Sequence, residues 1–116
     1  MSTPDSFVEY LVETLAPLGD IDARRMFGGV GIFCEGRMFA LIADERLYVK
    51  QDAENRDAYD AAGLPYFDYE KRGKVVRMGY RAVPEDAIDD GEALRHWAAL
   101  GVGAAERSGG SRKRST

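Results

Sequence analysis

The chain has 116 residues, of which 45% are hydrophobic and 31% charged, as is ordinary for a single soluble globular domain. The one cysteine, Cys34, excludes an internal disulfide, and acidic residues interrupt the N-terminal apolar segment, which excludes a standard signal peptide. Because the longest apolar run, Met38 to Ala43, is far shorter than the roughly 20 residues of a membrane helix, we expect a cytoplasmic protein without membrane contact.

The first predicted element is a helix that begins after Thr3 and ends at Gly19. Thr3 can cap it, and Pro4 suits the first helical position because its missing N–H would have no partner there. Apolar residues recur at spacings of three or four and predict a face for the core: Phe7, Leu11, Leu15 and Leu18. We expect Gly19 to end the helix in the left-handed conformation.

Three or four short strands follow, over residues 24–27, 30–34, 37–43 and 46–50. Glu35-Gly36 is a candidate two-residue hairpin turn, and Asp44-Glu45 is a second turn. Both alternating sets of side chains in the strand 37–43 are apolar, so we expect a central strand that is covered on both faces.

A short helix is predicted next, capped by Asp52 and ended by Gly63. Its apolar face is thin, so we expect it to be lightly docked. Beyond it, residues 66–70 and 74–81 form a predicted hairpin across a Lys-Arg-Gly turn.

The last helix is predicted to start at Asp89, with Glu92 completing a pattern like a capping box. The order of elements is helix, three or four strands, helix, two strands, helix. This order indicates an α+β domain with an antiparallel sheet, and no repeat or second domain is visible.

The net charge of −4 hides a difference between the body of the chain and its C-terminal end. Residues 107–116 hold four bases and no acid, whereas residues 1–106 hold 12 bases and 20 acids. We therefore expect one domain over residues 1–106 and a disordered basic tail over residues 107–116. The acidic body is a poor surface for phosphates, which leaves weak nucleic-acid contact to three tail residues: Arg112, Lys113 and Arg114.

No group of residues indicates catalysis, a metal or a cofactor. His96 is the only histidine, and a Cys34/His96 pair alone is not a plausible metal site. Cys34 could be a redox thiol, but a small buried residue is the favoured interpretation. The segment Gly28-Gly29-Val30-Gly31 lacks the spacing of a phosphate loop, and close crossing of strands explains its glycines better. The sequence therefore predicts no catalytic, metal-binding or cofactor-binding residue and a protein that is not an enzyme.

A set of short stretches forms a specific pattern only when taken together: Arg25-Met26-Phe27-Gly28-Gly29, Met38-Phe39-Ala40-Leu41, Leu47-Tyr48-Val49-Lys50, Phe67-Asp68-Tyr69, Met78-Gly79-Tyr80, Val83-Pro84 and Leu94-Trp97-Ala98. With it, residues 7–105 resemble the N-terminal domain of the bacterial TfoX/Sxy competence regulators. The resemblance implies a two-layer fold, a curved five-stranded antiparallel sheet backed by helices, similar to secretion-chaperone-like folds.

The resemblance also implies a role in transcriptional regulation of DNA-uptake genes, beside the cyclic-AMP receptor protein. Two departures from the family pattern bear on that role. Full-length regulators have a second, C-terminal domain, and this chain ends soon after its last predicted helix. Val30 stands where an aromatic residue is expected, a change that would alter an exposed surface on the glycine-rich strand.

Together these features predict a non-enzymatic regulatory or protein-interaction domain. We expect its binding surface near Arg24, Arg25, Phe27 and Tyr48, on the exposed face of the sheet. The partner would be a protein, such as a component of the transcription machinery, or a second copy that covers the other face of the central strand as a homodimer. The alternatives are a nucleic-acid contact through the basic tail and a small-ligand pocket under the sheet.

Overall fold

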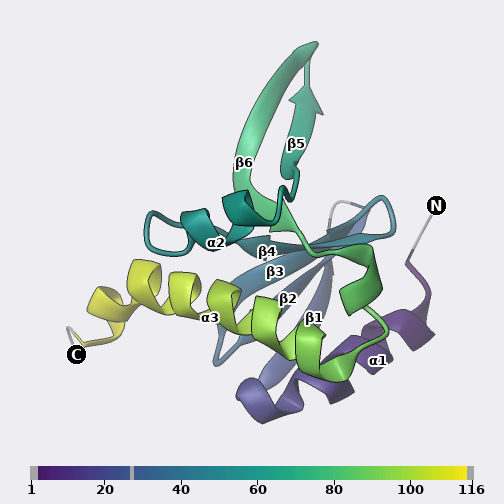
Figure 1. The fold of residues 1–116 in the computed structure, drawn as a ribbon, viewed down its shortest axis with the longest axis vertical. Coiled ribbons are helices and arrows are strands. Elements are labelled where there is room, and N and C mark those ends of the chain that lie inside the picture. Colours follow the sequence, from purple (N-terminus) through teal and green to yellow (C-terminus); the bar gives the residue numbers. More distant parts are fainter. Residues whose placement is uncertain (1–2, 27, 115–116) are drawn as a thin grey trace.

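The computed structural model describes residues 3–26 and 28–114, and for residues 110–114 it describes the backbone alone. Figure 1 shows the arrangement of the elements. They are α1 (Asp5–Leu15), η1 (Ala16–Leu18), β1 (Ile21–Met26), β2 (Gly29–Cys34), β3 (Arg37–Ala43), β4 (Arg46–Lys50), α2 (Arg56–Ala61), β5 (Tyr66–Lys71), β6 (Lys74–Ala82), η2 (Glu85–Ala87) and α3 (Gly91–Arg114). None of the helices in the described ranges is long and apolar enough to cross a membrane.

The strands form one antiparallel sheet in the order β1-β2-β3-β4-β6-β5. The predicted α+β class with an antiparallel sheet is confirmed, although the sheet has six strands and the family resemblance implied five. Strand β1 pairs with β2 from Ile21↔Cys34 to Met26↔Gly29 and so begins three residues before the strand that is predicted over residues 24–27.

The bounds of β3 and β4 are as predicted, because tight turns fix them. The backbone at Glu35 and Gly36 has φ of 53° and 83°, and that at Asp44 and Glu45 has φ of 53° and 61°. A positive φ at both central residues is the mark of the two-residue turns that match the twist of a hairpin. The hairpin of β5 and β6 turns in the same way.

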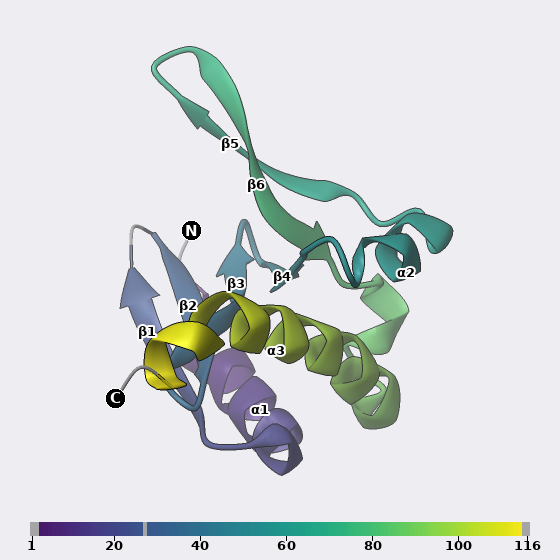
Figure 2. The ribbon, with the colours of Figure 1, turned by 90° about the vertical axis from the view of Figure 1, so that its left-hand side faces the viewer.

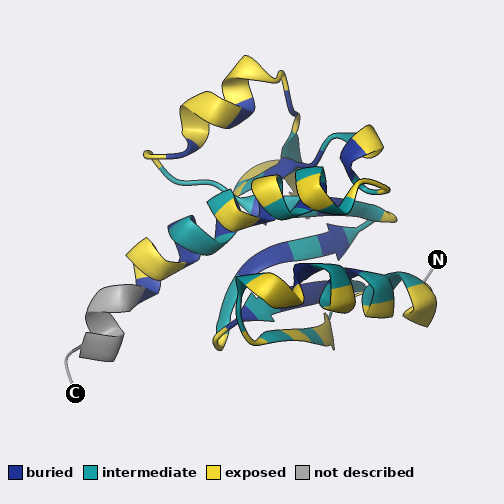
Figure 3. Ribbon diagram, turned by 60° about the horizontal axis from the view of Figure 1, so that its bottom comes forward, coloured by how far each residue is buried: buried dark blue, intermediate teal, exposed yellow. Residues whose placement is uncertain are grey.

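The core lies between the sheet and the long helices. Helices α1 and α3 lie on the same face of β1–β4, and they contribute buried residues to one apolar cluster with that face (Figure 3). Its fully buried members include Leu11, Leu15, Ile32, Phe39, Ile42, Leu47, Val49 and Leu94. Helix α3 approaches the sheet closely at Gly101, where an added Cβ would lie 2.8 Å from the carbonyl oxygen of Phe39.

The ends of the first helix differ from the prediction. Pro4, rather than Thr3, is the N-cap, because the backbone N–H groups of Phe7 and Val8 donate to the Pro4 carbonyl oxygen. The α-helix stops at Leu15 and continues as a 3₁₀ turn, since Pro17 has no N–H to extend the α-helical pattern. Gly19 has φ 148° and ψ −162°, which is a glycine conformation but not the left-handed helical one.

The starts of the later helices are also shifted. Asp52 does not cap α2; its carboxylate accepts hydrogen bonds from the backbone N–H groups of Glu54 and Asn55, in the turn before the helix. Only Tyr59 of α2 is buried, which agrees with the expected light docking. Asp90, one residue after the predicted cap, accepts from the N–H groups of Glu92 and Ala93 at the start of α3.

Helix α3 continues past the predicted domain boundary at residue 106. Arg107 pairs with Asp52, and the Ser108 hydroxyl donates to the carbonyl oxygen of Ala105. These two residues are therefore helical and attached to the domain. Where the domain ends beyond them stays a prediction.

Candidate interaction surface

The second face of the sheet, opposite the helices, carries the candidate site, and we call it the outer face. All three α-helices of the described part lie on the other side, α2 through the stacking of Tyr59 on Trp97 at 5.9 Å between ring centroids. Strand pairing, with a register shift at Phe39 that brings Met38 and Leu41 to the same side, places apolar side chains on the outer face: Met26, Phe33, Met38, Leu41 and Tyr48. These residues are half-buried, because neighbours within the sheet cover them only in part.

Gly31 lies at the centre of the apolar part of this face. A Cβ at this position would lie 2.9 Å from Met26 Cε, 3.3 Å from Met38 Sδ and 3.3 Å from the Phe33 ring. Because Gly31 has no side chain, the side chains of Met26, Met38 and Phe33 can pack over its backbone in β2. Arg24 holds its guanidinium 4.7 Å above the Phe33 ring, which places a cation at the rim.

The outer face extends across the sheet to the base of the β5–β6 hairpin. Tyr48 contacts Phe67 of β5, with ring centroids 4.9 Å apart, and the Lys50 ammonium lies 5.4 Å from the Tyr80 ring centroid. Burial of Tyr80 raises the pKa of its hydroxyl group. The result is a surface of methionine and aromatic side chains with basic groups along its border.

The residues predicted for the binding surface do not form one cluster. Arg24 and Tyr48 both lie on the outer face. Arg25 points the other way, where it donates to the Thr3 carbonyl oxygen at 3.0 Å and pairs with Asp5. Arg25 therefore fastens β1 to the start of α1. Phe27 lies outside the described residues.

The side chains of Arg112, Lys113 and Arg114 also lie outside the described part of the chain, so the predicted nucleic-acid contact of the tail stays a prediction. Val30 corrects another expectation: it is 2% exposed and faces the helices, so a valine there changes the core and not an exposed surface.

Sequence reasoning did not single out Met26, Phe33, Met38 or Phe67 as members of the surface. Their signal was present in the alternation, since both sets of side chains in β3 are apolar. Which of these side chains face the helices is decided by the register shift between β2 and β3 and by the docking of α1 and α3, and neither follows from a local pattern. Met38 and Leu41, the outer apolar residues of β3, are half-buried and, within the described residues, no second layer covers them.

The remaining polar groups do not converge on a reactive centre in the described residues. Cys34 is 4% exposed in the core, as the favoured interpretation has it, and burial is the main reason why the pKa of its thiol is raised. His96 packs edge-on against Trp97 at the surface of α3. Within residues 3–26 and 28–109, no group of three histidine, cysteine or acidic side chains is placed to hold a metal ion.

A hollow of about 600 Å³ lies where α1, the β3–β4 turn and η2 meet. Its polar lining is mainly acidic, from Asp44, Glu45, Glu85 and Asp89, and apolar side chains such as Phe7 complete it. Neither Cys34 nor His96 lines it. The lining therefore holds no cysteine or histidine beside the hydroxyl group of Thr3.

The chain is similar in sequence to known bacterial proteins. Residues 13–105 match the TfoX N-terminal domain family. The chain is 38% identical over 68 residues to the DNA transformation protein TfoX1 of Aliivibrio fischeri, which covers 59% of this chain and 32% of that protein. It is 32% identical over 74 residues to the protein Sxy of Escherichia coli, covering 63% of this chain and 35% of that one. The chain thus spans about a third of the length of these curated relatives.

Proposed function

We propose that this chain, which belongs to the TfoX N-terminal domain family, is a non-enzymatic regulatory domain that binds a protein of the transcription machinery through its outer face. The proposed role is taken from the relative in Aliivibrio fischeri, which is named as a DNA transformation protein. The process that this domain regulates would then be DNA uptake.

The observation that carries the proposal is the uncovered apolar outer face. Methionine and aromatic side chains are enriched at protein interfaces, where methionine adapts to an irregular partner surface. Here Met26, Met38, Phe33 and Tyr48 combine both kinds on one face of the sheet, with Arg24 at the rim. Protein binding would complete the burial of a strand that is apolar on both faces.

The proposal is tested by capture from the native bacterial cytoplasm on three immobilised chains: the wild type, a Phe33→Ser/Leu41→Ser variant and a Val75→Ser/Val76→Ser control. The control makes matched apolar-to-serine changes away from the outer face, at side chains that are 69% and 45% exposed. We expect RNA polymerase or the cyclic-AMP receptor protein on the wild type and the control, and their loss from the outer-face variant. Circular dichroism must show that all three chains are folded.

Two results would contradict the proposal. One is equal capture of these proteins by the outer-face variant. The other is a wild-type dimer at high micromolar concentration that the outer-face variant abolishes, because a second copy of the chain would then be the occupant of the face. Sedimentation equilibrium on the same variants measures this.

A further inference from the structure

The hairpin of β5 and β6, which we call the arm (residues 66–80), projects from the rest of the molecule (Figures 1 and 2). Residues 68–77 are all exposed, the longest such run in the described part of the chain. The large apolar side chains that are exposed among the described residues, Tyr69, Val75 and Val76, all lie on the arm. These three side chains are not part of the hydrophobic core, so their apolar character is not explained by packing within the domain.

Charge is divided between the arm and the rest of the domain. The arm holds four bases and two acids, whereas the rest of residues 1–106 holds eight bases and eighteen acids. The distal segment 71–77 contains four bases and no acid. The net negative charge of the chain therefore hides a positively charged arm, which projects away from the acidic rest of the domain.

The base of the arm is anchored, so its direction is defined. Arg81 is 3% exposed, and its guanidinium donates twice to the carbonyl oxygen of Leu64, at 3.0 and 2.8 Å. It also pairs with Asp60 at 2.9 Å and lies 4.0 Å from the Tyr66 ring centroid. These contacts tie β6 to the segment that follows α2.

The charges near the tip are available to a partner. Arg77 pairs with Asp68 at 3.2 Å and contacts Tyr66, so part of its charge is used within the arm. Lys71, Arg72 and Lys74 take part in none of the ion pairs formed among residues 3–26 and 28–109.

The two faces of the arm differ in charge. Tyr69 lies directly opposite Val76, and Lys71 opposite Lys74, so alternation places all four on one face. Asp68 and Glu70 lie on the other face. One side of the ribbon therefore offers two ammonium groups, a phenol and an isopropyl group without a carboxylate.

We propose that the arm binds double-stranded DNA, with Lys71, Arg72 and Lys74 on backbone phosphates and the carboxylate-free face of the ribbon in the major groove. That groove is about 12 Å wide and 8.5 Å deep and admits a two-stranded ribbon. Six residues of strand extend about 20 Å, which reaches the groove floor while the acidic body stays outside. The deep, narrow major groove of duplex RNA does not admit such a ribbon. The proposed contacts lie in the distal part of the arm, whereas the outer face reaches only Phe67 and Tyr80 at its base, so the proposal does not depend on the proposed protein partner.

The test measures fluorescence anisotropy of a labelled 20-base-pair DNA duplex with the full chain at 50 to 200 mM salt. The Lys71→Ala/Arg72→Ala/Lys74→Ala variant removes three positive charges from the arm. The matched control, Arg112→Ala/Lys113→Ala/Arg114→Ala, removes three from the tail. Because the three arm residues are exposed and form none of the ion pairs of the described residues, we expect both variants to keep the wild-type circular dichroism and thermal midpoint.

Three phosphate contacts predict that wild-type affinity falls about 40-fold between 50 and 200 mM salt. The arm variant should lose that salt dependence together with most of its affinity, and the tail variant should keep both. The proposal is overturned if the wild type does not bind, or if the tail variant loses binding and the arm variant does not. It is also overturned if polyglutamate of equal charge competes as well as unlabelled DNA, because the arm would then select acidic polypeptides.

Discussion

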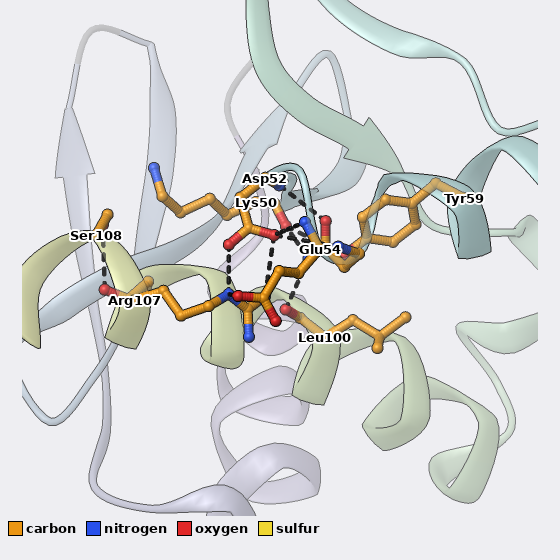
Figure 4. Close-up of polar contacts among 9 residues, drawn as sticks. Lys50, Asp52, Glu54, Tyr59, Leu100, Arg107 and Ser108 are labelled. Carbon is orange, nitrogen blue, oxygen red and sulfur yellow. Dashed lines mark hydrogen bonds and ion pairs between the residues drawn. The ribbon is translucent and has the colours of Figure 1, made fainter.

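Arg107 and Asp52 form a two-point ion pair that joins the C-terminal half of α3 to the turn before α2 (Figure 4). The Nε–H of Arg107 donates to Asp52 Oδ2 at 2.6 Å and the Nη2–H to Oδ1 at 2.9 Å. Glu54 lies 3.5 Å from the same guanidinium. The hydrogen bond from Arg107 is the main reason why the pKa of Asp52 is lowered.

An Arg107→Gln variant tests how much this pair stabilises the fold. Since the Arg107 side chain is 37% exposed and solvent screens the charges, we expect the free energy of unfolding to fall by only about 0.5–1 kcal/mol at pH 7. A double-mutant cycle with Asp52→Asn, which keeps an acceptor for the turn, isolates the pairing from other losses.

The same variant predicts a pH dependence. A carboxyl group whose pKa is lowered by folding stabilises the native state above its unfolded pKa of about 4, and this stabilisation is lost as the pH falls through the folded value. The difference between wild type and Arg107→Gln in urea unfolding should thus be constant from pH 5 to 7 and shrink below pH 4. A difference that grew at low pH would contradict the assignment.

Asn55 is the second element of this junction and is 5% exposed. Its amide nitrogen donates to the carbonyl oxygens of Lys50 and Leu100, and its oxygen accepts from the Asp52 N–H. An Asn55→Ala variant removes these three hydrogen bonds, and of the Lys50 contacts only the bond from the Tyr59 hydroxyl stays, so we expect a loss of about 1–3 kcal/mol in urea unfolding. The control Glu54→Ala, at a 71% exposed side chain of the same turn, should lose less than about 0.5 kcal/mol. Equal losses would show that Asn55 is not a special contact.

The fold was predictable where local signals fix it. Adjacent turn residues such as Glu35 and Gly36 fix the ends of β3. The apolar residues at consecutive positions of that strand predict a sheet with apolar side chains on both faces. The junction of Asp52 and Arg107 was not predictable, because the two residues are 55 positions apart and no local pattern links them. For the same reason, the sequence alone predicts a helix cap at Asp52.

The candidate surfaces were predictable only in part. The hairpin of β5 and β6 was expected, but alternation gives the faces of a hairpin and not its direction relative to the body. Arg81 illustrates the difficulty, because an arginine in a strand predicts exposure and this one is buried against Leu64 and Tyr66. The contacts of Arg81 at the base of the arm are tertiary, so no local pattern predicts how the arm lies relative to the body.

Gly101 and Gly103 offer a matched test of how closely α3 packs on the sheet. An added Cβ at Gly101 would lie 2.8 Å from a backbone oxygen of β3, whereas at Gly103 it would meet only the end of the flexible Arg107 side chain at 3.3 Å. We expect Gly101→Ala to lower the free energy of unfolding by about 1–3 kcal/mol. Gly103→Ala should leave it unchanged or raise it by up to about 1 kcal/mol, through better helix propensity. Stabilisation by both substitutions would mean that α3 lies farther from the sheet.

Cys34 provides a test of the core at alkaline pH. The thiol is buried beside Gly19, where an added Cβ would lie 2.8 Å from its sulfur, and burial raises its pKa. The unfolded chain loses the thiol proton near pH 8.5 while the folded chain keeps it. Stability from this group is therefore complete below pH 8.5 and is lost as the pH rises toward the folded pKa.

We expect the free energy of unfolding of the wild type to decline between pH 8 and 9.5, and that of Cys34→Ala to stay nearly constant over the same range. Alkylation of the folded wild type by iodoacetamide at pH 8 should be slower than that of the urea-unfolded chain, because the thiolate is the reacting species and burial raises the pKa of the thiol. Equal alkylation rates would place the thiol at the surface and contradict its position in the core.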